Sequence, residues 1–274
     1  MPVLPVVHRF GFRIEAEAPH LPPTAHAHAE IELAWLHRGS ARMAFVGGEA
    51  ALARGRLSAH FAGFPHRLVA RSTDAFVTWV TLPLEAAADG LVPGSLLRAC
   101  LGGAVVIDPD PLPGDQAWIE RCAADWRRSP AWTAQVREEL RVRLHRLALA
   151  AGLADGPRTG SGPFLAQAVG GLIAAAEDPG ATLASVARRI GYHPTYFVQR
   201  FRRLTGHGAL AVLTRLRVAR AMRILTERST LDQRQVAARA GFGSVRAMQR
   251  GFVRICGRTP GAWLRLADRP ATDR

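Results

Sequence analysis

At 274 residues, the chain is long enough to form two domains of ordinary size, each with its own hydrophobic core. Its formal net charge is +14, and all 36 basic residues are arginines. Residues 160–274 carry 19 of these arginines and only six acidic residues, whereas the first 159 residues are almost neutral. A basic region confined to one part of the chain predicts a surface that binds phosphate groups, as in a nucleic-acid-binding domain.

Cysteine usage and hydropathy exclude several classes of protein. Cys100, Cys122 and Cys256 are scattered and form no CxxC pair, which argues against a disulfide framework or a cysteine-rich zinc site. The first ten residues lack the apolar run of a signal peptide, and no stretch approaches the ~20 apolar residues of a membrane span. We therefore expect a soluble, cytoplasmic protein.

The N-terminal half, residues 1–150, is predicted to be a β-domain followed by helices. Apolar and polar residues alternate in short runs over residues 24–82, a pattern typical of an all-β sandwich or barrel. Helical periodicity then appears over residues 84–101, 115–128 and 133–151. The last of these helices carries an apolar stripe, with arginines on its other faces: Val136, Leu140, Leu144 and Leu147. This helix is expected either to pack against its own domain or to form a dimer contact.

Four residues of the predicted strands have the types and spacing of a metal or ligand site. His26, His28 and Glu32 share one face of a strand because the side-chain period is two, and His66 follows on a neighbouring strand. Three imidazoles and a carboxylate suit a divalent metal. The alternative is that the same four side chains line a pocket for a small-molecule effector. We expect no catalytic residue in this set, because a fold alone implies no chemistry.

The opposite face of the same strand is also apolar, with Ile31, Leu33 and Trp35. A strand that is apolar on both faces must have each face buried against another part of the protein. The helices after Pro83, or a second subunit, are the candidates for the outer cover.

A Gly/Pro-rich segment over residues 151–163 is predicted to be a linker, and residues 164–274 show only helical periodicity. Within this second domain, VARRIGY at 186–192 is repeated as VAARAGF at 236–242, and FRRLTG at 201–206 as FVRICG at 252–257. Each copy is predicted to be a short helix, a glycine turn and a longer helix, which is a helix-turn-helix unit.

Local signals define the ends of these helices. Thr182 and Ser244 are predicted N-caps, Gly191 supplies a left-handed turn, and Pro194 occupies the first turn of the longer helix. One helix over residues 209–227 separates the two units and spans roughly 25–30 Å. Such a spacer would place the two longer helices about one DNA turn, roughly 34 Å, apart in successive major grooves.

The inward positions of the longer helices are apolar, namely Phe197, Phe201 and Leu204, and then Met248, Phe252 and Ile255. Their outward faces are predicted to contact DNA, because Arg and Gln make paired hydrogen bonds to G and A edges. The predicted DNA-binding residues are Thr195, Val198, Gln199, Arg202, Arg203, Arg246, Gln249, Arg250 and Arg254. Taken one by one, each arginine is better explained by a phosphate contact or by solvation than by a base contact. As a set on two repeated helices, these residues favour a DNA-binding surface.

Residues 182–263 resemble the DNA-binding domain of the AraC/XylS family of regulators. The matching residues are Ala187, Gly191, Pro194, Phe201, Thr205, Gly206, Leu216, Arg217, Ala219, Arg220, Ala237, Gly241, Phe242, Phe252, Gly257 and Pro260. Two departures lie in the second unit: Ala247-Met248 replaces an aromatic pair, and Gly251 lies in mid-helix. Since a mid-helix glycine costs ~1 kcal/mol relative to alanine, we expect this unit to be looser and less selective.

The spacing of His26, His28, Glu32 and Gly39, followed by Gly55, Gly63 and His66, resembles the two motifs of the cupin barrel. Cupins are the sensor domains of many AraC-type regulators. Phe61 and Ala70 depart from the usual proline and asparagine. A fainter likeness of residues 82–106 to the melibiose-type branch favours a sugar effector.

The resemblance implies an α+β protein of two domains: a cupin-like barrel with helices, and an all-α domain of two helix-turn-helix motifs joined by a long helix. It implies a transcription regulator, more often an activator than a repressor, with double-stranded DNA, a small-molecule effector, RNA polymerase and a second copy of the chain as partners. This interpretation requires no cofactor, and a divalent metal is the one cofactor that the cupin motif could hold. The alternatives are a metal-dependent cupin enzyme fused to a DNA-binding tail and a protein that binds DNA without sequence preference.

Overall fold

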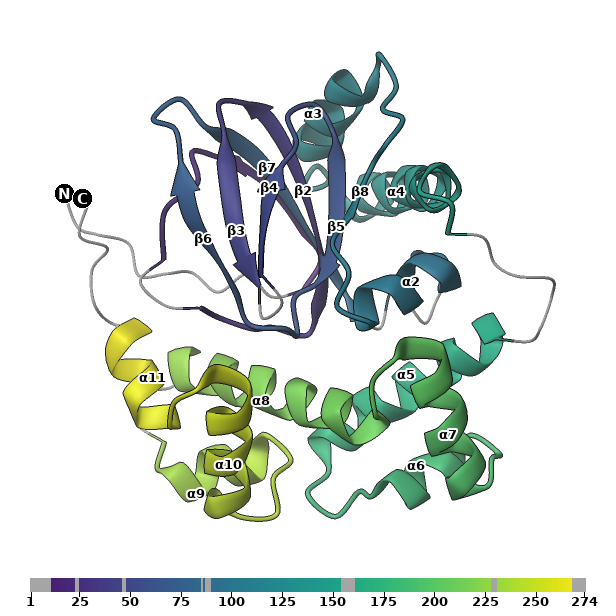
Figure 1. Cartoon of the computed structure of the whole chain (residues 1–274), viewed down its shortest axis with the longest axis vertical. Helices are drawn as coiled ribbons and strands as arrows, with labels where there is room; N and C mark the ends of the chain where they lie inside the picture. Colours follow the sequence, from purple (N-terminus) through teal and green to yellow (C-terminus); the bar gives the residue numbers. More distant parts are fainter. Residues whose placement is uncertain are drawn as a thin grey trace.

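The computed structural model of the chain describes residues 11–22, 25–45, 48–84, 86, 90–153, 161–227 and 231–267. Figure 1 shows a sheet domain with flanking helices above and a helical domain below, with the long helix α8 crossing beneath the sheets. This is the two-domain mixed α/β architecture predicted from the sequence. The predicted linker over 151–163 falls largely outside the described residues, and the next helix begins at Ser161.

Two antiparallel sheets form the N-terminal domain. The first contains five strands in the order β1-β7-β2-β5-β8, and the second contains three in the order β4-β3-β6. The strands are β1 (Arg13–Glu17), β2 (Glu30–Arg38), β3 (Ala41–Phe45), β4 (Gly48–Leu52), β5 (Leu57–Phe61), β6 (His66–Arg71), β7 (Phe76–Pro83) and β8 (Val106–Ile107). Strand β2 lies at the centre of the larger sheet, where it pairs with both β5 and β7.

The central strand is buried on both faces, as its apolar pattern predicts. Ile31, Leu33 and Trp35 belong to a core cluster shared with helices α2 (Gly94–Leu101) and α4 (Pro130–Ala150). The outer cover of this sheet is therefore supplied by the chain's own helices, which flank the sheet in Figure 1. Ser129 caps α4 by accepting a hydrogen bond from the backbone N–H of Trp132.

The predicted apolar stripe of α4 packs into this core, and all four of its members are buried. One arginine of this helix departs from the expected pattern. Arg143 is buried rather than exposed, because its guanidinium lies between the carboxylates of Asp108 and Asp115. Asp108 follows β8, and Asp115 begins helix α3 (Asp115–Asp125), so the three side chains join both segments to α4.

In the described part of the C-terminal domain there are seven helices: α5 (Ser161–Glu177), α6 (Leu183–Arg189), α7 (Pro194–Thr205), α8 (Ala209–Glu227), α9 (Gln233–Arg239), α10 (Val245–Cys256) and α11 (Pro260–Ala267). Helix α8 has the predicted bounds and contacts helices of both halves of the domain. Arg217 donates to the carbonyls of Ala175, Asp178 and Ala181, and Arg220 donates to the carbonyl of Arg239. These bonds satisfy carbonyls near the C-terminal ends of α5 and α9, which intrahelical bonds leave open, and the carbonyl of Ala181 just before α6.

The two domains pack directly against each other. Helix α2 contacts α5 and α7. Phe64, in the turn between β5 and β6, lies under the guanidinium of Arg215 at 4.3 Å, and its ring centroid is 5.3 Å from that of His207. In addition to the α2 contacts, the single side chain of Phe64 therefore connects the sheet domain to helix α8 and to His207, which follows the first helix-turn-helix unit.

Three features of the fold differ from the sequence prediction. Strands β1 and β8 were not anticipated. Within the stretch predicted as one helix over 84–101, the described residues Leu84 and Ala86 are helical, and a separate helix, α2, begins at Gly94 after its N-cap Pro93. Among the described residues, no helix is long and apolar enough to cross a membrane.

Candidate functional site

The first helix-turn-helix unit is built by strong local signals. Thr182 and Ser185 form a reciprocal capping box at the start of α6, as the predicted N-cap requires. Gly191 has a φ of +80°, which a residue with a Cβ adopts at a cost. Pro194 begins α7, and Gly206 ends it in the left-handed conformation. Phe197 and Phe201 are fully buried, so the opposite face of α7 is left toward solvent.

The second unit repeats this construction. Asp232 and Gln235 form the capping box of α9, and Ser244 caps α10 by accepting from the N–H of Ala247. Gly241 has a φ of +75°, and Gly257 ends α10 in the same left-handed conformation as Gly206. Met248 and Phe252 are fully buried. The predicted caps and turns are confirmed, and so are the inward residues, although Leu204 and Ile255 are only partly buried against the core.

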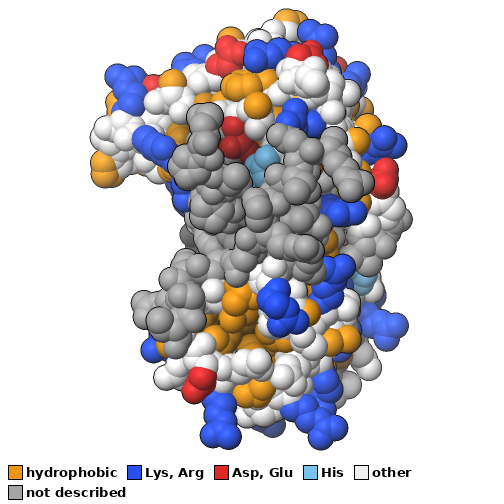
Figure 2. Space-filling view, turned by 90° about the vertical axis from the view of Figure 1, so that its left-hand side faces the viewer, with side chains coloured by type: hydrophobic (Ala, Val, Ile, Leu, Met, Phe, Trp, Pro, Cys, Tyr) orange, Lys and Arg blue, Asp and Glu red, His pale blue; other side chains and the backbone are white. Residues whose placement is uncertain are grey.

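The outward faces of α7 and α10 carry the predicted DNA-binding residues. Eight of the nine are exposed, and Gln249 is half-buried, where it donates to the side chain of Gln233 at 2.9 Å. On the face shown in Figure 2, arginine side chains project from the helical domain at the lower end of the molecule. The prediction omitted Tyr196, which is 42% exposed on α7 beside Thr195. Its neighbour Arg200 instead packs over the rings of Tyr196 and Phe164 and is a structural residue.

Gly251 has a packing role that the sequence did not reveal. It is buried in α10, and a Cβ there would lie 3.3 Å from both Val218 of α8 and the ring of Phe242. The missing side chain permits α10 to approach α8 closely. Close packing gives a reason for a glycine at this position, and the lower selectivity expected of this unit stays a prediction.

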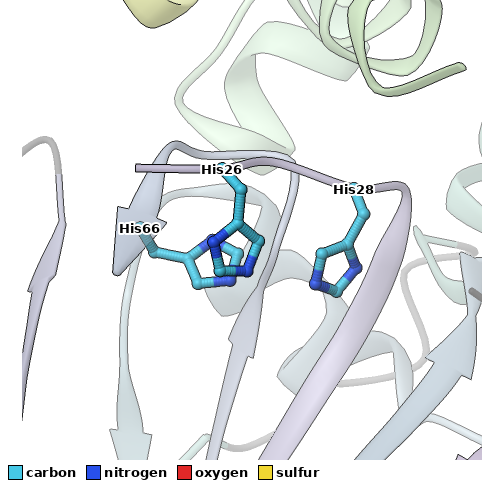
Figure 3. A group of neighbouring side chains, drawn as sticks. All are labelled: His26, His28 and His66. Carbon is cyan, nitrogen blue, oxygen red and sulfur yellow. The ribbon is translucent and has the colours of Figure 1, made fainter. Parts of the chain in front are cut away.

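The predicted histidine and carboxylate residues lie together between the two sheets. Figure 3 shows His26 and His66 side by side, with His28 next to them. The ring centroids of His26 and His66 are 4.4 Å apart, and those of His28 and His66 are 5.3 Å apart. Glu32 Oε2 lies 3.1 Å from His28 Nε2 and 3.5 Å from His66 Nε2. The structure therefore brings all four predicted residues into one cluster.

A fifth residue, His60, belongs to this cluster and was missed. It lies on β5 directly opposite Glu32 of β2, and its ring centroid is 5.0 Å from that of His66. The strand reads LSAHF, so His60 alternates with its apolar neighbours, and this alternation was the only signal in the sequence that pointed to His60. The strand register that sets it against Glu32 is a long-range property that this alternation does not contain.

The charges in the cluster are unevenly distributed. Burial lowers the pKa of His28, but hydrogen bonds to Glu30 and Glu32 and the charges of these carboxylates raise it to about 9. Burial lowers the pKa of His60 to about 3 despite the attraction of Glu32. Burial raises the pKa of Glu32, but hydrogen bonds from His28 and His66 hold it well below its usual range. At neutral pH the cluster thus holds a charged His28 between two carboxylates and a neutral His60.

Two groups in the cluster have donor atoms close enough together to bind a metal: His26, His28 and His66, and Glu32, His60 and His66. Within each group the donor atoms lie within 4.8 Å of one another. Imidazole and carboxylate donors fit Zn²⁺ and related divalent cations. In the first group, however, both ring nitrogens of His28 already contact carboxylates, at 2.9 and 3.1 Å.

Comparison with known proteins identifies the helical domain. A family model described as a helix-turn-helix domain matches residues 186–266. Among solved structures, ToxT from Vibrio cholerae O395 has a TM-score of 0.56 and 9% identity, covering 94% of this chain and 98% of ToxT. ToxT bound to (E)-4-(8-methylnaphthalen-1-yl)but-3-enoic acid has a TM-score of 0.57 and 10% identity, covering 93% of this chain and 98% of ToxT.

The DNA-binding domain of AdpA, solved with a target DNA, is 33% identical over 39% of this chain and 97% of that domain, with a TM-score of 0.35. No curated protein matches the chain. The ToxT structures show that the two-domain fold is shared along nearly the whole length of both chains. The family model therefore assigns residues 186–266, which contain most of both helix-turn-helix units, to helix-turn-helix domains.

Proposed function

We propose that this chain is a sequence-specific transcription regulator that binds double-stranded DNA and responds to a small molecule held in its sheet domain. The observation that carries the proposal is the pair of helix-turn-helix units built on α8. Both units have a capping box on the short helix and left-handed glycines in the turn and at the end of the longer helix, and both leave an arginine-containing helix face exposed. In this proposal α7 and α10 enter successive major grooves, with base contacts from some of these side chains and phosphate contacts from the others.

Genomic-fragment selection with the full chain, followed by footprinting at physiological salt, tests this function. We expect a motif with two half-sites about one helical turn apart. Tight binding with no recovered motif would contradict sequence-specific regulation and would favour the non-specific alternative. The genes beside recovered sites would then identify the regulated operon.

Gln199 and Arg246 are the strongest candidates for base contacts, because each lies on the exposed face of one longer helix. Gln199→Ala or Arg246→Ala is expected to weaken binding to the selected site by ~1–3 kcal/mol and to relax specificity at one position. Competition binding against the selected site and random DNA measures both effects. Arg121→Ala, which removes an exposed arginine of α3, is the matched control and should change neither. Equal losses on both DNAs would reassign the residue to a phosphate contact.

For the effector, we propose a site at the cluster of His26, His28, Glu32 and His66. A cavity of about 230 Å³ adjoins it, lined by Phe45, His60, Phe61, Phe64, His207 and residues 102–105. Its walls come from both domains, so a bound molecule would contact both. ToxT, which shares the fold, has been solved with a bound naphthalenyl butenoic acid and with an unsaturated fatty acid. These ligands support a small organic acid as the effector, and the melibiose-type resemblance supports a sugar.

We also propose that the protein acts in the cytoplasm as a non-catalytic activator that contacts RNA polymerase as a dimer, as the family resemblance implies. Turnover by the purified, metal-loaded protein would contradict the non-catalytic role. A monomeric mass in sedimentation at micromolar concentration, with and without DNA, would contradict dimerisation.

The contact between Phe64 and His207 is expected to weaken in acid. Burial lowers the pKa of His207, and the charge of Arg215 lowers it further. The unfolded chain therefore takes up this proton first, and the folded state loses stability as the pH falls below about 6.5. Between about pH 8 and about pH 5.5, the melting temperature of the wild type should fall more than that of His207→Gln. His145→Gln, an exposed histidine of α4, is the control and should follow the wild type.

A further inference from the structure

The buried cluster between the sheets contains one set of donors that could bind a metal, and two of its three residues also belong to the proposed effector site. Glu32 of β2, His60 of β5 and His66 of β6 are all buried, and their donor atoms lie within 4.8 Å of one another. Glu32 and His60 belong to the five-stranded sheet and His66 to the three-stranded sheet. A ligand bound by all three would therefore join the two sheets.

His60 supplies the most direct evidence for a ligand. Its Nε2 atom is buried and has no hydrogen-bond partner among the residues that the structure describes. A buried ring nitrogen without a partner destabilises a fold unless something binds it. Phe45 covers one side of the ring, at 5.0 Å between centroids, and Glu32 lies opposite in the strand register.

His66 is oriented to bind the same ligand. Its Nδ1 atom donates a hydrogen bond to the carbonyl oxygen of Phe64 at 2.9 Å, so Nε2 is the ring nitrogen that faces the cluster. Nε2 lies 3.5 Å from Glu32 Oε2 and is the atom that would bind a metal. Two ligands at about 2.1 Å from a tetrahedral zinc ion are separated by about 3.4 Å. The backbone carbonyl of Phe64 thus has the position of the outer partner that fixes a metal-binding histidine.

We propose that Glu32, His60 and His66 bind one divalent transition-metal cation, with His28 outside the coordination sphere. Both ring nitrogens of His28 are occupied by Glu30 and Glu32, so this residue orients the carboxylate of Glu32 without binding the metal. Two imidazoles and a carboxylate select zinc, iron, cobalt or nickel over magnesium and calcium. Three protein ligands leave a coordination position open, and the adjoining cavity of about 230 Å³ is lined by His60.

This site shares residues with the proposed effector site but does not depend on DNA binding. The experiment uses full-length protein, freed of metal with a chelator and then titrated with Co²⁺ and with Zn²⁺ alone. We expect one ion per chain, a visible d–d absorption band for Co²⁺, and a higher melting temperature in the presence of either metal. DNA affinity is measured separately on the same samples, so a failure of the metal proposal is distinguishable from a failure of the regulator proposal.

Variants identify the ligands. His60→Gln, His60→Ala and Glu32→Gln should each weaken Co²⁺ binding at least tenfold. His26→Ala, at the neighbouring ring, and the surface control His145→Ala should retain it. Circular dichroism establishes that each variant is folded. X-ray absorption of the zinc-loaded wild type counts the imidazole ligands without any substitution, and we expect two.

Three results would overturn the proposal. The first is the absence of binding by the wild type at millimolar metal. The second is full binding by folded His60→Gln. The third is a count of three imidazoles, which would assign the site to His26, His28 and His66 instead.

Discussion

Gly241→Ala is expected to lower the free energy of unfolding by about 3–5 kcal/mol, whereas Gly191→Ala should lower it by only about 1–2 kcal/mol. The two glycines occupy the same position in the two helix-turn-helix units, and both have a left-handed backbone, with φ values of +75° and +80°. An alanine at either position therefore carries the same backbone strain. The surroundings of the two glycines differ.

A Cβ on Gly241 would lie 2.1 Å from the carbonyl oxygen of Ala176 and 2.9 Å from its carbonyl carbon. These are backbone atoms of α5, so relief of the clash requires movement of a helix end. A Cβ on Gly191 would have no heavy atom within 4 Å among the described residues. The difference between the two variants thus isolates the cost of packing from the cost of backbone strain.

Denaturant unfolding of both variants measures the difference, and footprinting shows whether the second half-site is lost first. We expect Gly241→Ala to lose protection of the half-site bound by α10, because the turn that positions this helix is displaced. Equal destabilisation by the two substitutions would show that the second unit does not pack against α5 as the structure has it.

The two helix-turn-helix units could be predicted from the sequence because local signals determine them. Thr182 and Ser244 as caps, Gly191 as the turn and the bounds of α8 all follow from residues near in sequence. The repeat added a second copy of the same evidence. Local signals did not reveal how each unit packs. That packing makes the surroundings of Gly241 and Gly191 different and gives a reason for Gly251.

The histidine cluster could be predicted only in part. His26, His28 and Glu32 are close in sequence, and the motif also contains His66, so the first four members were found. His60 joins them because β5 pairs with β2 in a register that places it opposite Glu32. A shift of one residue would turn His60 to the other face of the sheet. Likewise, Glu30 is close to His28 in sequence, but the hydrogen bond between its carboxylate and His28 Nδ1 depends on the turn that precedes β2.

The other large effect is expected at Arg143 of α4. Its Nε and Nη2 atoms donate to the two carboxylate oxygens of Asp115 at 3.0 and 2.7 Å, and Nη2 also contacts Asp108. All three side chains are buried. Arg143→Ala would leave two carboxylates buried without their cation and should lower the free energy of unfolding by ~3–5 kcal/mol.

Arg141→Ala is the matched control on the same helix. Arg141 forms an exposed pair with Glu138 three residues earlier, and its loss should cost at most about 0.5 kcal/mol. A third variant, in which Arg143→Met is combined with Asp108→Asn and Asp115→Asn, removes the charges together. It should recover much of the stability, because the cost of Arg143→Ala comes from uncompensated charge and not from the lost ion pair itself.

The position of the ion triad connects this prediction to the histidine cluster. Asp108 follows β8, which pairs with β5, and the backbone N–H of Asp108 donates to the carbonyl of Leu57 at the start of β5. Strand β5 carries His60 three residues later. A loss of stability at Arg143 should therefore be accompanied by weaker Co²⁺ binding, with the triple variant restoring both. A destabilised Arg143→Ala that binds Co²⁺ as tightly as the wild type would show that the edge of the sheet opens without disturbing the strand register on which the cluster depends.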